Sequence, residues 1–174
     1  MDYDFRMNPE QLKELQAPLK AKYRETPDAA VITLKADGTL GEGITCSVQT
    51  GKALTAAGLH PATGGNGLSA CSGDMLLEAL VACAGVTLGA VATAIGVNVK
   101  TGSVHAEGDL DFRGTLGVAK DAPVGFKTIR LRFDLDTDAN DDQIATLAKL
   151  TERYCVVAQS LRQPPAITIT RRAA

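Results

Sequence analysis

The chain has 174 residues, the length of one domain, and its 18 basic and 20 acidic residues give a net charge of −2. This balance argues against nucleic acid or an anionic membrane as the main partner. There is no Trp, and the aromatic residues are four Phe and three Tyr, so platforms for stacking bases are not expected and the core must be aliphatic.

The N-terminus carries the signature of a helix start. Asn8 is a capping residue, Pro9 occupies the first helical position and Gln11 stands three residues after the cap, which predicts a helix to about Tyr23. The stretch is acidic and polar with no apolar signal-peptide core, so we expect a cytoplasmic protein. We interpret residues 1–174 as one domain with an N-terminal helical extension over 1–27.

The chain contains four cysteines, at positions 46, 71, 83 and 155. In a reducing compartment these thiols are expected to be free or catalytic rather than paired in structural disulfides. The sequence has no Cys-x-x-Cys pair and no compact His/Cys cluster, so neither a structural zinc site nor another cofactor is expected.

Residues 29–35 and 44–49 are short and β-branched, and Asp37-Gly38 between them predicts a hairpin turn. Cys46, inside the second strand, is interpreted as a small buried residue. The segment 51–73 is long and rich in Gly, which predicts a loop covering the element that follows. His60 within it is interpreted as a hydrogen-bonded strut rather than a proton carrier.

The centre of the chain is an uncharged run of 19 residues, Ala79–Val97, with Cys83 inside it. Asp74 and Glu78 suit the start of a helix and Gly96 its end. The run is long enough to span a membrane, but it is rich in Ala, Gly and Thr and lacks flanking basic clusters, which favours a buried helix. Because the helix is apolar on nearly every side, it must be wrapped by protein, and a subunit partner is expected.

The remaining segments predict a sheet with helices packed against it. Residues 97–112 alternate loosely and 126–136 alternate cleanly, as expected for antiparallel strands with one buried face. A capped amphipathic helix follows over 136–155, a second short helix begins near Cys155, and 166–172 closes the chain as a strand. The predicted fold class is therefore α+β, with helices held against antiparallel sheet.

Two thiols stand out by their context. Cys83 lies in the central helix, and Cys155 lies near a helix N-terminus, where the macrodipole lowers a thiol pKa. If the fold brings them together they form a peroxidatic and a resolving cysteine, and otherwise they are two buried structural residues. Their separation of 72 residues leaves both readings open.

The segments GDMLLEALVACAGVTL and ERYCVVAQSL, some 70 residues apart, resemble the OsmC/Ohr family of osmotically induced and organic hydroperoxide resistance proteins. The similarity extends from about Thr33 to Arg171. It implies an intertwined homodimer in which antiparallel sheets wrap two central helices. It also implies that Cys83 is the peroxidatic thiol and Cys155 the resolving one. The implied substrates are organic hydroperoxides, and the implied reductant is a dithiol such as a lipoyl group.

The sequence departs from the pattern of the family's peroxidases. The family glutamate ten residues before the reactive cysteine falls on Gly73, so Asp74 and Glu78 become the candidate carboxylate partners. Residues 33–50 contain no arginine to hold the thiolate, and Arg24 is the nearest candidate. The expected Cys-Pro-Val reads Cys-Val-Val at 155–157.

Cys71 precedes Cys83 by twelve residues, about 120° around a helix and some three turns along it, so a direct bridge between them is not expected. It is either a packing residue, which we favour, or an alternative reactive thiol facing Cys155. The missing arginine also leaves a second function open, a non-peroxidase dimer that binds a small hydrophobic molecule in a pocket lined by the cysteines. The presence of both cysteines in their motifs favours the peroxidase.

Overall fold

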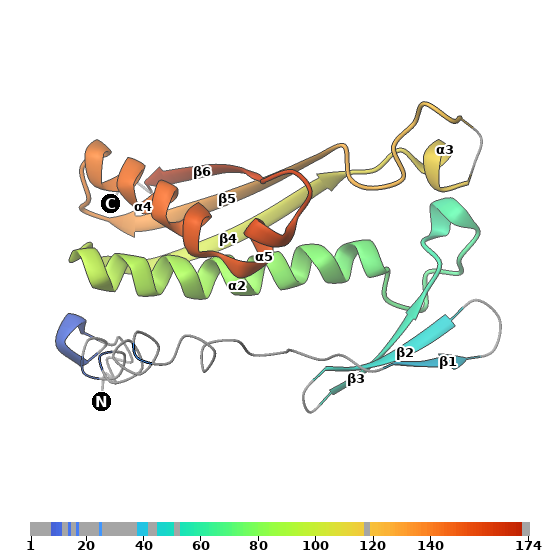
Figure 1. The fold of residues 1–174 in the computed structure, drawn as a ribbon, viewed down its shortest axis with the longest axis horizontal. Coiled ribbons are helices and arrows are strands. Elements are labelled where there is room, and N and C mark those ends of the chain that lie inside the picture. Colours follow the sequence, from blue (N-terminus) through green and yellow to red (C-terminus); the bar gives the residue numbers. More distant parts are fainter. Residues whose placement is uncertain are drawn as a thin grey trace.

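The computed structural model describes residues 8–11, 14, 17, 25, 38–41, 45–50, 53–116 and 119–171. Its elements, in chain order, are β1 (Gly38–Gly41), β2 (Thr45–Thr50), β3 (Ala53–Gly58), the 3-10 turn η2 (Pro61–Thr63), α2 (Ser72–Ile95), β4 (Val99–Asp109), α3 (Phe112–Thr115), β5 (Thr128–Thr137), α4 (Asp141–Tyr154), α5 (Val156–Ser160) and β6 (Ala166–Arg171). The fold is mixed α+β, as the sequence predicted (Figure 1).

The N-terminal capping box predicted from the sequence is present. The backbone N–H of Gln11 donates to Asn8 Oδ1 at 2.9 Å, and the backbone N–H of Asn8 donates to Gln11 Oε1 at 3.0 Å. The described residues at 9–11, 14, 17 and 25 are helical. The strand predicted over 29–35 lies outside the described residues.

The strands form two three-stranded sheets, in the orders β1-β2-β3 and β4-β5-β6. β4 and β5 pair antiparallel from Val99 opposite Thr137 to Asp109 opposite Thr128. The predicted alternation of β5 is confirmed, because Leu131, Phe133 and Leu135 are buried while their neighbours point outward. The buried face of β5 forms one side of the hydrophobic core.

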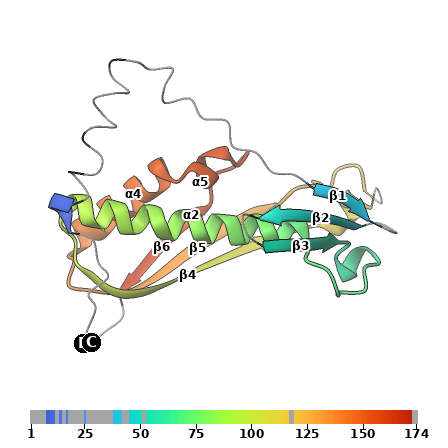
Figure 2. The ribbon, with the colours of Figure 1, turned by 90° about the horizontal axis from the view of Figure 1, so that it is seen from below.

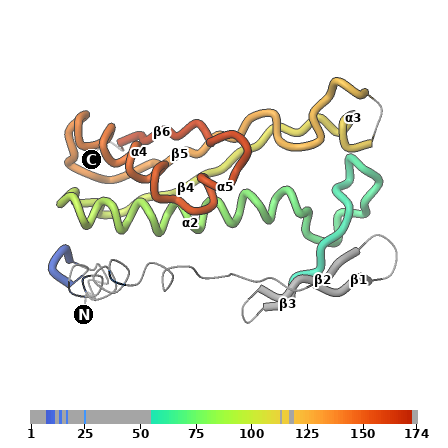
Figure 3. Tube along the Cα trace, in the orientation of Figure 1, coloured from blue at the N-terminus to red at the C-terminus, as the bar shows by residue number. Residues whose placement is uncertain are grey.

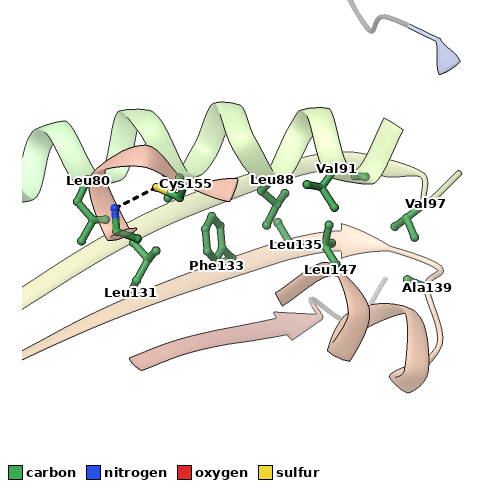
Figure 4. Close-up of a cluster of buried hydrophobic side chains, with 13 residues drawn as sticks. Leu80, Leu88, Val91, Val97, Leu131, Phe133, Leu135, Ala139, Leu147 and Cys155 are labelled. Atoms are coloured by element: carbon green, nitrogen blue, oxygen red, sulfur yellow. Dashed lines mark hydrogen bonds between the residues drawn. The ribbon is translucent and has the colours of Figure 1, made fainter. Parts of the chain in front are cut away.

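Helices α2, α4 and α5 form the core together with one face of the β4-β5-β6 sheet. α2 packs along β4 and against α4 and α5, while α4 also contacts β6. Figure 2 shows α4 and α5 lying beside α2, so that the three helices share this face. In the close-up of Figure 4, the buried side chains of α2 and β5 interdigitate with Leu147 of α4 and with Cys155.

The long central helix is confirmed as α2. Asp74 lies in its first turn, and the helix ends at Gly96, which takes the left-handed conformation (φ 73°) and donates its N–H to the carbonyls of Ala92 and Thr93. An L-residue with a side chain would be strained at this φ, which is why a glycine stops the helix here.

The sequence predicted a helix covered on all sides, but a single chain covers only one stripe of α2. The buried positions repeat at helical spacing and are Leu80, Ala84, Leu88, Val91 and Ala92. On the opposite side Val86 is 76% exposed. α2 is also the one helix in the described part of the chain that is long and apolar enough to cross a membrane. Its stripe packs into the core, as a core helix would.

Two local predictions in the first part of the chain were wrong. Gly38, predicted as a turn residue, begins strand β1, and the predicted loop over 51–73 contains strand β3. Short strands of Gly, Ala and Thr carry weak β signals, and pairing with β2 is what fixes them. The end of β3 is also tied to the segment before α2 by two backbone hydrogen bonds: the N–H of Gly58 donates to the Ala70 carbonyl, and the N–H of Ala70 donates to the Ala56 carbonyl.

The short helix α3, between strands β4 and β5, lies at the same end of the molecule as η2 in Figure 3. The ring of His60, just before η2, stacks on Phe112 of α3 at 5.0 Å. His60 Nδ1 also accepts a hydrogen bond from the Ala62 N–H at 3.0 Å. The interpretation of His60 as a hydrogen-bonded strut is therefore supported.

The last strand differs from the prediction of an antiparallel sheet, because β6 runs parallel to β5. The chain between them forms α4 and α5, which carry it from one end of the sheet back to the other. A helical crossover of this kind joins parallel strands, whereas a hairpin joins antiparallel ones. This crossover brings Cys155 over the sheet and against α2.

Candidate functional site

The site is built at the junction between α4 and α5. Cys155 lies between the two helices, as the C-cap of α4 and the N-cap of α5. Its N–H donates to the Thr151 carbonyl at 3.0 Å, which ends α4. Its sulfur accepts the Ala158 N–H at 3.5 Å, which caps the start of α5 (dashed line in Figure 4). Cys155 is fully buried, with an exposed fraction of 0%. The junction thus fixes both the backbone and the sulfur of this thiol.

Cys83 faces this junction from α2. It is half-buried and packs against the core that contains Cys155. The backbone N–H groups of Val157 and Val156 and the side chains of Cys155 and Thr87 are placed to stabilise its thiolate by hydrogen bonding. The structure therefore brings together the two thiols singled out in the sequence, and both are free in it.

These contacts determine the acidity of Cys83. Burial raises the pKa of the thiol, but the hydrogen bonds from Val157, Cys155, Thr87 and Val156 outweigh it and bring the pKa below its ordinary value. All four donors are uncharged. The first turn of α5, Cys155 and Thr87 thus stabilise the thiolate by hydrogen bonding, without the arginine that residues 33–50 lack.

The pKa of Cys155 shifts in the opposite direction, upward. Burial raises its pKa, and the neighbouring Cys83 sulfur raises it further by hydrogen bonding and charge, against the lowering effect of the Ala158 N–H. The sequence predicted that the N-terminus of α5 would activate Cys155 itself. Its free N–H groups instead act on both thiols: those of Val157 and Val156 help to lower the pKa of Cys83, whereas those of Ala158 and Val157 do not offset the burial of Cys155.

The departure from the Cys-Pro-Val pattern has a structural consequence. Val156 stands where the family pattern has proline, and a proline has no N–H. Here the Val156 N–H is one of the donors to the Cys83 sulfur. The sequence showed the substitution but gave no sign of its effect, because the donor belongs to the backbone.

Neither candidate carboxylate faces Cys83 from within its own chain. Asp74 and Glu78 are both exposed on α2. At about 100° per residue, Asp74 lies on the opposite side of the helix from Cys83 and Glu78 about 140° away from it. Their role as partners of the thiol stays a prediction.

Gly73, at the position of the family glutamate, is enclosed by other side chains. A Cβ there would contact the Cys71 sulfur, Leu110 and Phe126, each at 3.6 Å. Cys71 is the N-cap residue of α2, and its side chain makes no capping hydrogen bond. This environment favours the packing role of Cys71.

A groove of about 780 Å³ runs beside the C-terminal half of α2 and the first half of β4. Leu88, Phe133 and Leu135 contribute to its wall, whereas Cys83 and Cys155 do not line it. It is therefore a different feature from the ligand pocket with cysteine walls that the sequence left open. In the described part of the chain no three His, Cys, Asp or Glu residues are grouped to hold a metal ion.

A family model of the OsmC-like proteins matches the chain over residues 64–170. The chain belongs to this family. The match spans α2 with Cys83, both helices around Cys155 and nearly all of β6. No curated protein matches the sequence significantly.

Solved structures of OsmC-like proteins share the fold at low identity. An OsmC-like protein from Mycoplasma pneumoniae superposes with a TM-score of 0.67 at 14% identity, covering 82% of this chain and 99% of the other. An organic hydroperoxide resistance protein from Elizabethkingia anophelis gives 0.63 at 15% identity, with 83% and 99% covered. One from Legionella pneumophila gives 0.62 at 16%, again with 83% and 99% covered. At these identities the likeness establishes the fold alone.

Proposed function

We propose that this OsmC-like protein is a thiol-dependent peroxidase that reduces organic hydroperoxides through Cys83 and Cys155. The observation that carries the proposal is the pair itself: Cys83, with a lowered pKa, hydrogen-bonded to a second thiol that is buried beside it. A low pKa supplies the thiolate, which is the nucleophile, and the second thiol supplies the means to close a disulfide. The names of several solved relatives point in the same direction.

In the first step the Cys83 thiolate attacks the terminal oxygen of the hydroperoxide. An S–O bond forms, the O–O bond breaks, and the departing alkoxide takes a proton to leave as an alcohol. Cys83 becomes a sulfenic acid. The hydrogen bonds from Val156, Val157 and Thr87 favour this step by increasing the fraction of Cys83 that is ionised.

In the second step the Cys155 thiolate attacks the Cys83 sulfur. An S–S bond forms, the S–O bond breaks, and the hydroxyl group leaves with a proton as water. A dithiol reductant, of the lipoyl type or another, then restores both thiols by exchange. Such a cycle operates where thiols are kept reduced, which is consistent with the predicted cytoplasmic location.

A second copy of the chain is part of the proposal. α2 leaves an apolar side uncovered, with Val86 and Leu76 exposed, directly beside the site. A large exposed apolar surface next to a core helix is typical of a subunit interface. We propose that the homodimer covers this side and completes the walls of the hydroperoxide site.

The test treats reduced protein with one equivalent of cumene hydroperoxide and maps the thiols by mass spectrometry. The expected product is a Cys83–Cys155 disulfide that forms within seconds. Cys83→Ser should abolish the reaction, whereas Cys155→Ser should stop at a Cys83 sulfenic acid that a cyclic dione can trap. Cys71→Ser is the matched control and should react as the unmodified chain does.

Thiols that stay reduced at a large excess of hydroperoxide would reject the peroxidase. In that case the second candidate, a dimer that binds a small hydrophobic molecule, would become the leading function. The groove beside α2 is the feature that this alternative would use, although it is not lined by the cysteines as expected.

A further inference from the structure

Thr151 is a buried polar residue that the proposed mechanism does not yet use. It lies in the last turn of α4 with an exposed fraction of 0%. Its Oγ1 is the one buried side-chain nitrogen or oxygen atom without a hydrogen-bond partner among the described residues. A buried hydroxyl without a partner is unfavourable, because it has lost water and gained nothing in exchange. Such an atom calls for an explanation.

The position of Thr151 points to Cys155. The two residues are four apart, and the Thr151 carbonyl accepts the N–H of Cys155. Side chains four apart on a helix are neighbours on the same face. The buried positions of this segment are Leu147, Thr151, Cys155 and Ala158, so the side chains of Thr151 and Cys155 both lie on the buried side of a segment that packs against α2.

We propose that the Thr151 hydroxyl donates a hydrogen bond to the Cys155 sulfur while that sulfur becomes negatively charged in the step that closes the disulfide. In the reduced state Cys155 is protonated, its sulfur already caps the Ala158 N–H, and the hydroxyl has no anion to bind. When Cys155 loses its proton to attack Cys83, a charge appears in a site closed to water. Once turned toward the sulfur, the Thr151 hydroxyl stabilises this charge by hydrogen bonding.

Thr151 is on this account a positioning residue for the second step only. It leaves the reactivity of Cys83 toward an oxidant unchanged, because Cys83 takes its hydrogen bonds from other donors. The inference rests on the proposed pairing of the two thiols, but the closing step can be observed without a hydroperoxide. Its failure can therefore be told apart from a failure of the peroxidase.

The test uses dithiodipyridine and the full chain with Cys46→Ala and Cys71→Ala, so that Cys83 and Cys155 are the only thiols. Attack of Cys83 on the reagent releases one thiopyridone and leaves a mixed disulfide. Attack of Cys155 on the Cys83 sulfur releases the second thiopyridone and leaves the Cys83–Cys155 disulfide. The rate of the second release, followed by absorbance across pH, reports on Cys155 alone.

Thr151→Val has nearly the shape of threonine but lacks the hydroxyl. We expect it to slow the second release about tenfold at neutral pH and to move its pH profile upward, with the first release unchanged. Thr151→Ser restores the hydroxyl and should recover most of the rate. Urea unfolding should show that the valine variant is at least as stable as the parent.

Two results would overturn the inference: a second release in Thr151→Val with the parent rate and pH profile, or a serine variant as slow as the valine one. Absence of the second release in the parent would overturn it as well. If the valine variant does not fold, Thr151→Ala and Thr151→Ser give the same comparison in smaller side chains. A parent that closes the disulfide with dithiodipyridine but not with cumene hydroperoxide would reject the peroxidase and leave the role of Thr151 standing.

Discussion

At the scale of single residues, the acidity of Cys83 depends on backbone groups of another helix. Val156 is the first residue of α5, and the conformation of Cys155 before it (φ −74°, ψ 108°) suits a residue that precedes proline. Val156→Pro therefore removes one donor to the Cys83 sulfur and fits the backbone at the first helical position. We expect it to raise the pKa of Cys83, so that the pH profile of its alkylation by iodoacetamide moves upward. At pH values below the pKa of Cys83, alkylation of the proline variant should be several-fold slower than that of the unmodified chain.

Val156→Ala keeps the N–H and is the matched control, because the Val156 side chain is itself exposed. It should alkylate as the unmodified chain does. An alkylation profile that is the same in the proline and alanine variants would show that the Val156 N–H has no part in stabilising the thiolate.

The residue types at the site were readable from the sequence to different degrees. Cys83 stood out because a thiol inside a long uncharged run is unusual, and Cys155 because of its place in a recognisable segment. Thr87, Val156, Val157 and Thr151 carried no signal of their own. Their contribution depends on what lies opposite them, and that is decided by how α5 meets α2.

At the scale of elements, α4 holds the crossover in place and begins with a full capping box. The Gln143 N–H donates to Asn140 Oδ1, and the Asn140 N–H donates to Gln143 Oε1, each at 2.9 Å. Asn140→Ala removes the side-chain cap and should lower the free energy of unfolding by about 1 kcal/mol, as measured by urea denaturation.

Lys149→Ala, at an exposed position within the same helix, serves as its control and should change the stability by less than about 0.5 kcal/mol. Equal stability of the Asn140 variant and the parent would contradict the assigned cap. Since α4 ends at Cys155, the same denaturation series can be followed by thiol exposure.

The elements that were mispredicted share a physical cause. β1 and β3 are short runs of Gly, Ala and Thr, and the direction of β6 depends on the helices that precede it. Strand identity in such segments comes from pairing with a neighbour, which local periodicity does not reveal. By contrast, α2, α4 and β5 have long periodic patterns and were predicted close to their observed bounds.

At the scale of the whole molecule, the uncovered side of α2 predicts an obligate dimer. A charge placed in the middle of this side would be buried in the interface without a partner. Val86→Glu should therefore raise the dissociation constant of the dimer by at least about tenfold, measured by sedimentation at several concentrations. Val124→Glu changes a similarly exposed valine outside the helix and should leave the dimer intact.

A parent chain that sediments as a stable folded monomer at low concentration would contradict this prediction and the proposed walls of the hydroperoxide site together. A dimer that persists unchanged in Val86→Glu would place the interface elsewhere on the molecule. The groove beside the C-terminal half of α2 is lined in part by Val86. The binding of a small molecule in this groove should therefore differ between the monomer and the dimer.

The sequence by itself determined the class of the fold, the central helix, the cleanly alternating strand and the two candidate thiols. These follow from periodicity, composition and a resemblance carried by two short segments, all of which are local in the chain. Only the tertiary structure decided that the thiols meet, that N–H groups of α5 act on Cys83 as well as on Cys155, and that the Thr151 hydroxyl is buried without a partner among the described residues. Hydrogen bonding and burial depend on what another part of the chain places nearby, and spacing along the sequence does not contain that information.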